Sequence, residues 1–266
     1  MASGLATTSS DAIARRFAEL RGSFRKAFVP YVTAGHPDPV RSVALLQGLE
    51  AAGADVIEVG VPFSDPLADG AVIQASSQRA LEQGVRFDQV LEIISSAGLS
   101  IPVVLFSYLN PLIRGGDDAL QRAAHAGVHG VLVTDLPLGA DPAREAWFAN
   151  SPLDFIRLVA PTTPSERMRQ IASTGSGFVY LISRLGVTGE QTSLSSELPA
   201  TAARLRAVTS LPLCIGFGIA TPEQARLAAT MADGVVVGSA IVRAANESVD
   251  AALALAAALR RGIDGA

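Results

Sequence analysis

PLCIGFGIATPEQARLAATMADGVVVGSA, residues 212–240, contains one complete strand–helix–strand unit. The runs PLCIGFG (212–218) and DGVVVGS (233–239) are apolar throughout rather than alternating, which is typical of strands covered by helices on both faces. Between them, Thr221 followed by Pro222 is a helix-start signal and predicts a helix over EQARLAATMADG. This stretch therefore predicts two parallel strands joined by a helix.

The same unit repeats along the chain. Six further β-rich apolar runs precede it: AFVPYVTA (27–34), DVIEVG (55–60), PVVLFSY (102–108), GVLVTD (130–135), DFIRLVA (154–160) and GFVYLIS (177–183). Helical patterns lie between them; Asp38 and Pro39, for example, open a helix that ends at Gly53. Eight units in this length favour a closed (β/α)8 TIM barrel over an open doubly wound sheet. We expect one barrel domain over residues 1–266.

Two additions to the plain barrel are expected. Ile13, Phe17 and Leu20 fall on one helical face, which predicts an extra N-terminal helix over Asp11–Arg21. The connections after the second and sixth strands are long: the first includes VPFSDPLADG (61–70) and an added helical stretch, the second RLGVTGEQTSLSSELP (184–199). Loops that follow barrel strands lie on the catalytic face, so the extra residues belong to the mouth of the barrel.

Composition excludes several classes of protein. The 266 residues are 49% hydrophobic, and the formal net charge is −4 with no dense Lys/Arg cluster, which argues against a nucleic-acid surface. No apolar run approaches the roughly 20 residues of a membrane span, and the start MASGLATTSSD has no hydrophobic signal core. We therefore expect a cytoplasmic protein with neither nucleic-acid nor membrane partners.

The residue inventory also excludes chemistries. Cys214 is the only cysteine, so neither an internal disulfide nor a Cys-rich metal site can form. Lys26 is the only lysine and precedes an apolar run, which argues against a Schiff-base aldolase, a pyridoxal enzyme and a Walker lysine. His125 and His129 lack the glutamate of an HExxH motif. No metal and no cofactor is expected in this chain.

Carboxylates at strand ends are the candidate catalytic groups. Glu58 interrupts the strand DVIEVG; it either forms a structural ion pair, for example with Arg157, or acts in proton transfer with a pKa raised by desolvation. Asp69 either caps the helix that starts near Ala71 or reaches back as a second carboxylate beside Glu58. Asp135 lies on the same face, and its place before a proline turn favours anchoring of a loop.

Aromatic residues and glycines predict the rest of a pocket. Tyr31, Tyr108 and Tyr180 all lie toward strand ends, which suggests an aromatic-lined pocket for a flat apolar ligand. The glycines of GFG (216–218) end the seventh strand, and Gly238 and Ser239 end the eighth and open a short helix, where barrels commonly bind phosphate. The residues alone therefore predict a phosphate-binding barrel enzyme without naming its substrate.

Five segments in order carry a family resemblance: FVPYVTAGHPD (28–38), EVGVPFSDPLADG (58–70), VYLISRLGVTG (179–189), IGFGIATPEQA (215–225) and VVVGSAIV (235–242). Over nearly the whole chain the sequence resembles the α subunit of tryptophan synthase, and EVGVPFSDPLADG is highly specific for it. The resemblance implies a lyase of tryptophan biosynthesis that performs the retro-aldol cleavage of indole-3-glycerol phosphate to indole and glyceraldehyde 3-phosphate on a (β/α)8 barrel.

The resemblance also implies roles for single residues. The family's catalytic glutamate and aspartate fall on Glu58 and Asp69. Its substrate-binding and phosphate-binding positions fall on two further sets. Tyr180 and Phe217 match positions at the substrate, and Gly189, Gly218, Gly238 and Ser239 match positions at its phosphate. Tyr31 and Asp135 are also expected at the substrate, because they lie toward strand ends on the same face of the barrel.

A partner is implied as well. Members of the family work in an α2β2 complex with a pyridoxal phosphate-dependent β subunit, and Pro62, Asp65, Asn110 and Pro111 fall in segments that face it. Ala71, where the family commonly has proline, and Leu185, where it often has a smaller residue, depart from the usual pattern and bear on loop closure.

Three alternatives share parts of these features. A stand-alone lyase that releases free indole would have the same active-site residues, and a non-catalytic regulatory subunit would keep the barrel without turnover. An epimerase or isomerase of sugar phosphates would explain the phosphate site but usually needs a metal or a different acid–base set.

Overall fold

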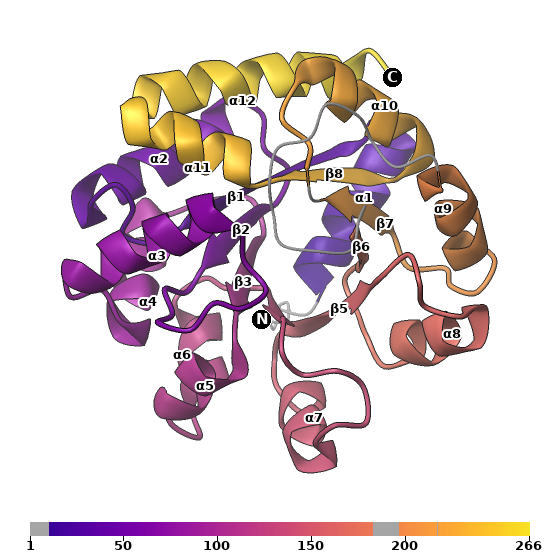
Figure 1. Cartoon of the computed structure of the whole chain (residues 1–266), viewed down its shortest axis with the longest axis horizontal. Helices are drawn as coiled ribbons and strands as arrows, with labels where there is room; N and C mark the ends of the chain where they lie inside the picture. The colour runs from indigo at the N-terminus through magenta and orange to yellow at the C-terminus, as the bar shows by residue number, and fades with distance from the viewer. Residues whose placement is uncertain (1–10, 183–196, 217) are drawn as a thin grey trace, which may run out of the picture.

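The computed structural model describes residues 11–182, 197–216 and 218–266. Its eight strands form a closed parallel barrel in which each strand pairs with its neighbours in chain order, as predicted (Figure 1). The strands are β1 (Ala27–Thr33), β2 (Ile57–Gly60), β3 (Val103–Ser107), β4 (Gly130–Val133), β5 (Asp154–Val159), β6 (Val179–Ile182), β7 (Leu213–Gly216) and β8 (Gly234–Val237).

Helices surround the barrel (Figure 1). They are α1 (Ala12–Gly22), α2 (Pro39–Ala51), α3 (Ala71–Glu82), α4 (Phe87–Ala97), α5 (Leu109–Arg114), α6 (Ala119–His125), α7 (Pro142–Ala149), α8 (Ser165–Ser173), α9 (Leu198–Arg206), α10 (Pro222–Met231), α11 (Ser239–Glu247) and α12 (Val249–Asp264). In the described ranges, none of them is long and apolar enough to cross a membrane.

The start signals in the sequence act as caps. The side chain of Asp38 accepts a hydrogen bond from the Arg41 N–H at 2.9 Å, with Pro39 in the first turn of α2. Thr221 and Gln224 form a reciprocal capping box at α10, around Pro222. Both caps supply acceptors for N–H groups that have no partner within their helix. Local sequence therefore sets where these helices begin.

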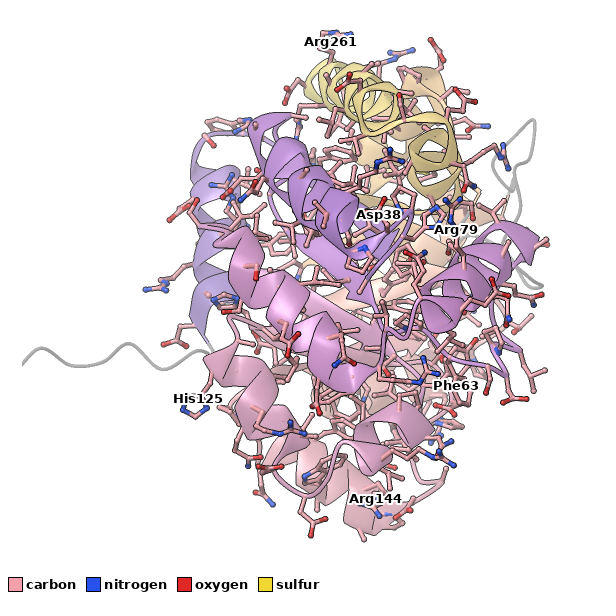
Figure 2. The ribbon with its side chains drawn as sticks, turned by 90° about the vertical axis from the view of Figure 1, so that its left-hand side faces the viewer. Asp38, Phe63, Arg79, His125, Arg144 and Arg261 are labelled. Carbon is pink, nitrogen blue, oxygen red and sulfur yellow. The ribbon has the colours of Figure 1, made fainter. Side chains whose placement is uncertain are left out.

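Helix α1 closes the N-terminal end of the barrel. Ile13, Phe17 and Leu20 are buried on the face that the sequence predicted, and the Phe17 and Phe178 rings lie 5.8 Å apart. Figure 2 shows the two ends of the barrel: Phe63, which follows β2, lies toward one end, and His125, which precedes β4, toward the other. Because α1 covers the end where strands start, the site must open at the end where strands finish.

The long second connection contains the predicted extra helical structure. Residues 61–70 lead into α3 and then α4 before β3 begins. Most of the long connection after β6, including Leu185 and Gly189, lies outside the described residues, as does Phe217.

Candidate active site

Glu58 is a buried carboxylate inside the barrel. It pairs in register with Tyr31 of β1 and Val104 of β3, and it is 1% exposed. Burial raises the pKa of Glu58 to about 8, because the charged form loses its hydration. Its Oε1 has no hydrogen-bond partner among the described residues. A group in this state is mostly protonated at neutral pH and can donate a proton.

The predicted ion pair between Glu58 and Arg157 is wrong. Arg157 Nη2 instead lies 3.1 Å from Glu145 Oε2, and its guanidinium stacks on the Phe155 ring. Phe155 belongs to the apolar layer between strands and helices, so Arg157 extends outward from β5. Glu58 therefore has no balancing cation among the described residues of its strand neighbours.

Asp69 is the second buried carboxylate. It lies in the connection after β2 and is 5% exposed. Burial raises its pKa to about 6, opposed by a hydrogen bond that Tyr108 Oη donates to Asp69 Oδ2 at 3.2 Å. Asp69 does not cap α3: the N-cap is Gly70, and no side chain caps that helix. The capping interpretation was wrong, and the side chain is directed to Tyr108.

Tyr31 and Tyr180 are buried beside Glu58. Burial raises the pKa of both phenols, and the negative charge of Glu58 adds to the increase in each. Asp69 acts on Tyr31 in the same way, so Tyr31 is a neighbour of both carboxylates. Space for the two hydroxyls comes from glycines: a Cβ at Gly60 would lie 2.1 Å from Tyr31 Oη, and one at Gly216 would lie 2.1 Å from Tyr180 Oη.

The predicted anion site lies at the start of α11. Gly238 is its N-cap and Ser239 its first residue, where N–H groups have no partner within the helix and the helix dipole attracts anions. A Cβ at Gly238 would lie 3.5 Å from Tyr31 Cβ, so this helix end adjoins the barrel interior. Gly218, after β7, has a φ of +79°, which glycine adopts without strain.

Asp135 lies at the end of β4 and is exposed. Its Oδ1 accepts a hydrogen bond from the Leu109 N–H at 2.7 Å, which is the loop-anchoring role that its position before a proline suggests. Leu109 is the first residue of α5 and follows Tyr108.

The predicted partner-facing residues come together. Pro62, Asp65, Asn110 and Pro111 all line one cavity of about 460 Å³ between the connection after β2 and helix α5. Two connections that are separate in sequence therefore form one surface at the end where the strands finish.

Sequence patterns did not predict one contact in the candidate site, the hydrogen bond between Tyr108 and Asp69. Position at a strand end placed Tyr108 near the pocket, but no spacing rule connects it to a residue in a different connection. The described residues contain no group of three or more His, Cys, Asp or Glu side chains that could hold a metal ion.

Two buried carboxyl groups with pKa values raised toward neutrality lie at the end of a closed (β/α)8 barrel where the strands finish. This arrangement is typical of a barrel enzyme that performs acid–base chemistry. The family model of the tryptophan synthase alpha chain matches residues 17–261. The chain belongs to that family.

Individual relatives agree. The tryptophan synthase alpha chain of Desulfatibacillum aliphaticivorans is 47% identical over 241 residues, which is 90% of this chain and 91% of the relative. That of Gluconacetobacter diazotrophicus is 46% identical, covering 90% and 89%. A solved structure of Mycobacterium tuberculosis tryptophan synthase superposes with a TM-score of 0.88 at 36% identity, covering 94% of this chain and 97% of that one. The alpha subunit from Legionella pneumophila gives 0.86 at 35% identity, covering 96% and 99%.

The chain is thus an alpha subunit of tryptophan biosynthesis. Its reaction is the lyase cleavage of indole-3-glycerol phosphate to indole and glyceraldehyde 3-phosphate. The readings as a sugar-phosphate isomerase and as a non-catalytic barrel are not supported.

Proposed function

We propose that Glu58 and Asp69 divide the acid–base work of this cleavage. Glu58 delivers a proton to C3 of the indole ring, while Asp69 accepts a hydrogen bond from the ring N–H and stabilises the positive charge that develops there. The observation that carries the proposal is the different surroundings of two buried carboxyl groups: Glu58 Oε1 has no hydrogen-bond partner among the described residues, whereas Asp69 Oδ2 accepts a hydrogen bond from Tyr108. Burial accordingly raises the pKa of Glu58 to about 8 and that of Asp69 to about 6. Between these values Glu58 holds a proton and Asp69 is an anion, as the two roles require.

The proton given by Glu58 is recovered in the next step. Protonation at C3 makes that carbon tetrahedral, and the ionised Glu58 then takes the proton of the hydroxyl on the adjoining glycerol carbon. The C–C bond breaks as the aldehyde forms, and its electron pair returns to the ring to give indole. One carboxyl therefore serves as acid and then as base, so no net proton is consumed.

The remaining residues bind the substrate in this proposal. The phosphate binds at the N-terminus of α11, on Gly238 and Ser239, and at Gly218, where helix N–H groups and the dipole favour an anion. Tyr31 and Tyr180 form walls of the indole site, because both rings lie beside Glu58. Gly189 and Phe217 are assigned to the phosphate and the adjoining wall by family resemblance alone.

We further propose that a β subunit docks on the surface formed by Pro62, Asp65, Asn110 and Pro111 in an α2β2 complex. Support comes from the shared cavity of these residues and from similarity to a chain of solved tryptophan synthase. Pyridoxal phosphate belongs to that partner in this proposal. Docking would order the connection that carries Asp69 and exclude water, so the partner raises the rate of cleavage.

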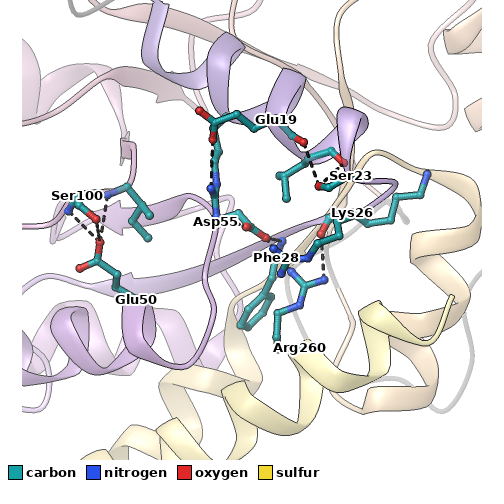
Figure 3. A network of polar contacts seen from close by, with 12 residues as sticks. Glu19, Ser23, Lys26, Phe28, Glu50, Asp55, Ser100 and Arg260 are labelled. Atoms are coloured by element: carbon teal, nitrogen blue, oxygen red, sulfur yellow. Dashed lines mark hydrogen bonds and ion pairs between the residues drawn. The ribbon is translucent and has the colours of Figure 1, made fainter.

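The test is indole release from indole-3-glycerol phosphate by the purified chain, with and without its cognate β subunit. Glu58→Gln removes the transferable proton and is expected to lower kcat by at least about 100-fold. The matched control is Glu50→Gln, because Glu50 binds Ser100 on the outside of the barrel and is expected to leave kcat unchanged (Figure 3). Glu58→Gln turnover at the wild-type rate would contradict the proposal, and fast turnover without any response to the β subunit would indicate a stand-alone lyase.

A further inference from the structure

Tyr108 makes two contacts with the short segment that carries Asp69. Its hydroxyl donates a hydrogen bond to Asp69 Oδ2 at 3.2 Å and accepts one from the Ala68 N–H at 2.9 Å. One hydroxyl therefore holds both the carboxylate and the backbone just before it. Tyr108 belongs to a different part of the barrel: it follows β3 directly and is the N-cap of α5.

Tyr108 is itself held from three sides. Asp135, at the end of β4, accepts the N–H of the next residue, Leu109, at 2.7 Å. The Ser107 hydroxyl donates to the Tyr108 carbonyl at 2.8 Å. The Phe63 ring, from the connection after β2, lies 5.0 Å from the Tyr108 ring. These contacts join the ends of β2, β3 and β4 around one phenol.

We propose that Tyr108 is the positioning residue of Asp69, and that Asp135 acts on the same carboxylate through Leu109 and Tyr108 rather than by touching substrate. With Oδ2 bound to Tyr108, Asp69 presents Oδ1 to the indole N–H. A carboxylate fixed in this way needs no reorientation when positive charge develops on the ring. This inference rests on the role proposed above for Asp69.

The hydrogen bond from Tyr108 to Asp69 affects how the reaction rate depends on pH. Donation by Tyr108 lowers the pKa of Asp69 against the effect of burial, so loss of the hydroxyl raises that pKa. Among the described residues, Tyr31 of β1 is the other titratable group that faces Asp69, and Glu58 of β2 faces Tyr31 in turn. Asp65 lies in the same connection as Asp69. Removing the Tyr108 hydroxyl leaves all of these groups in place, and it also removes the contribution that Tyr108 makes to the raised pKa of Tyr31.

Tyr108→Phe is the primary test, because it keeps the ring beside Phe63 and removes only the hydroxyl. We expect kcat for indole release to fall about 10-fold, the loss typical of a hydrogen bond to a charged group, with KM within about 2-fold. The fall in kcat/KM at low pH, which we assign to protonation of Asp69 and call the acidic limb of the pH profile, should move to higher pH. The matched control is Trp147→Phe, which removes a hydrogen bond from an aromatic side chain to the Asp117 carbonyl and should change neither kcat nor the limb.

A double-mutant cycle separates positioning from general damage. If Tyr108 acts through Asp69, Tyr108→Phe should lower kcat by no more than about 2-fold in an Asp69→Asn background. At Asp135, Asn keeps an oxygen for the Leu109 N–H and Ala does not, so Asp135→Ala should lower kcat more than Asp135→Asn. This pair decides the matter if Tyr108→Phe does not fold.

The outcomes separate the two proposals. Wild-type turnover by Asp69→Asn would overturn the role of Asp69, and this inference with it. A large loss in Asp69→Asn, with no change of kcat or acidic limb in Tyr108→Phe, would overturn this inference alone. So would equal losses from Tyr108→Phe in both backgrounds, or equal losses from Asp135→Asn and Asp135→Ala, which would point to a role for the Asp135 charge.

Discussion

Glu58 and Asp69 have the same functional group and ionise more than a pH unit apart. Both pKa values are raised by burial, to about 8 and about 6, but only Asp69 accepts a hydrogen bond that favours its charged form. We predict that kcat/KM for indole-3-glycerol phosphate is greatest between these values. Below about pH 6 Asp69 becomes protonated, and above about pH 8 Glu58 loses the proton that it donates.

The measurement is kcat/KM across pH 5 to 9.5 at constant ionic strength, because this ratio reports the ionisations of the free enzyme. Thermal unfolding at each pH serves as the control for loss of structure. A ratio that is flat up to pH 9.5 would contradict the assignment of the basic limb to Glu58. A ratio that rises steadily as pH falls below 6 would contradict the need for ionised Asp69.

Gly216 of strand β7 leaves room for the side chain of Tyr180 on the neighbouring strand β6. Gly216 lies at the end of β7, and a Cβ there would come within 2.1 Å of Tyr180 Oη and 2.9 Å of Val236 Cβ. We predict that Gly216→Ala forces the Tyr180 ring out of its position beside Glu58 and lowers kcat/KM by about 100-fold, since small displacements of substrate-positioning groups have effects of this size.

Gly22→Ala is the matched control, because nothing lies within 4 Å of a Cβ at Gly22 and its φ is not positive. Steady-state kinetics and circular dichroism of both variants make the comparison. Wild-type kcat/KM in a folded Gly216→Ala variant would show that Tyr180 need not occupy this place.

Elements differ in how well the sequence predicts them. The starts of α2 and α10 follow from local caps, and the strands from unbroken apolar runs, so both were predicted closely. The partners of individual side chains could not be predicted in the same way, because they depend on which elements the tertiary fold brings together. The sequence offered Arg157 as an ion-pair partner of Glu58, but Arg157 extends outward from β5 and pairs with Glu145. The contact between Tyr108 and Asp69 joins two connections 39 residues apart, and no local pattern encodes it.

At the scale of the whole molecule, the two ends of the barrel have different tasks. The end where strands finish carries Glu58, Asp69 and the start of α11, whereas the end where they start is closed by α1 and ion pairs. Asp55, just before β2, is fully buried and lies 2.6 Å from Arg16 Nη2 and 2.7 Å from Arg260 Nη1 (Figure 3). It also accepts the Phe28 N–H at 2.8 Å. One carboxylate thus joins the first helix, the second strand and the last helix.

Separation of these tasks predicts a change in stability without a change in catalysis. Asp55→Asn keeps an acceptor for the Phe28 N–H but removes the buried negative charge that Arg16 and Arg260 share, while Arg260 retains its ion pair with Asp264. The change is expected to lower the free energy of unfolding by about 2 kcal/mol. Glu166→Gln breaks an exposed ion pair with Arg169 and should lower the free energy of unfolding by less than about 1 kcal/mol.

Urea denaturation measures the stability of both variants, and kcat/KM at a temperature where each variant is folded should equal that of wild type. A large fall in kcat/KM of folded Asp55→Asn would mean that the two ends are coupled. The division is expected to hold because Asp55 acts on the starts of the strands, and the closed hydrogen-bonded sheet keeps their far ends in register even when the contact with α12 is weakened.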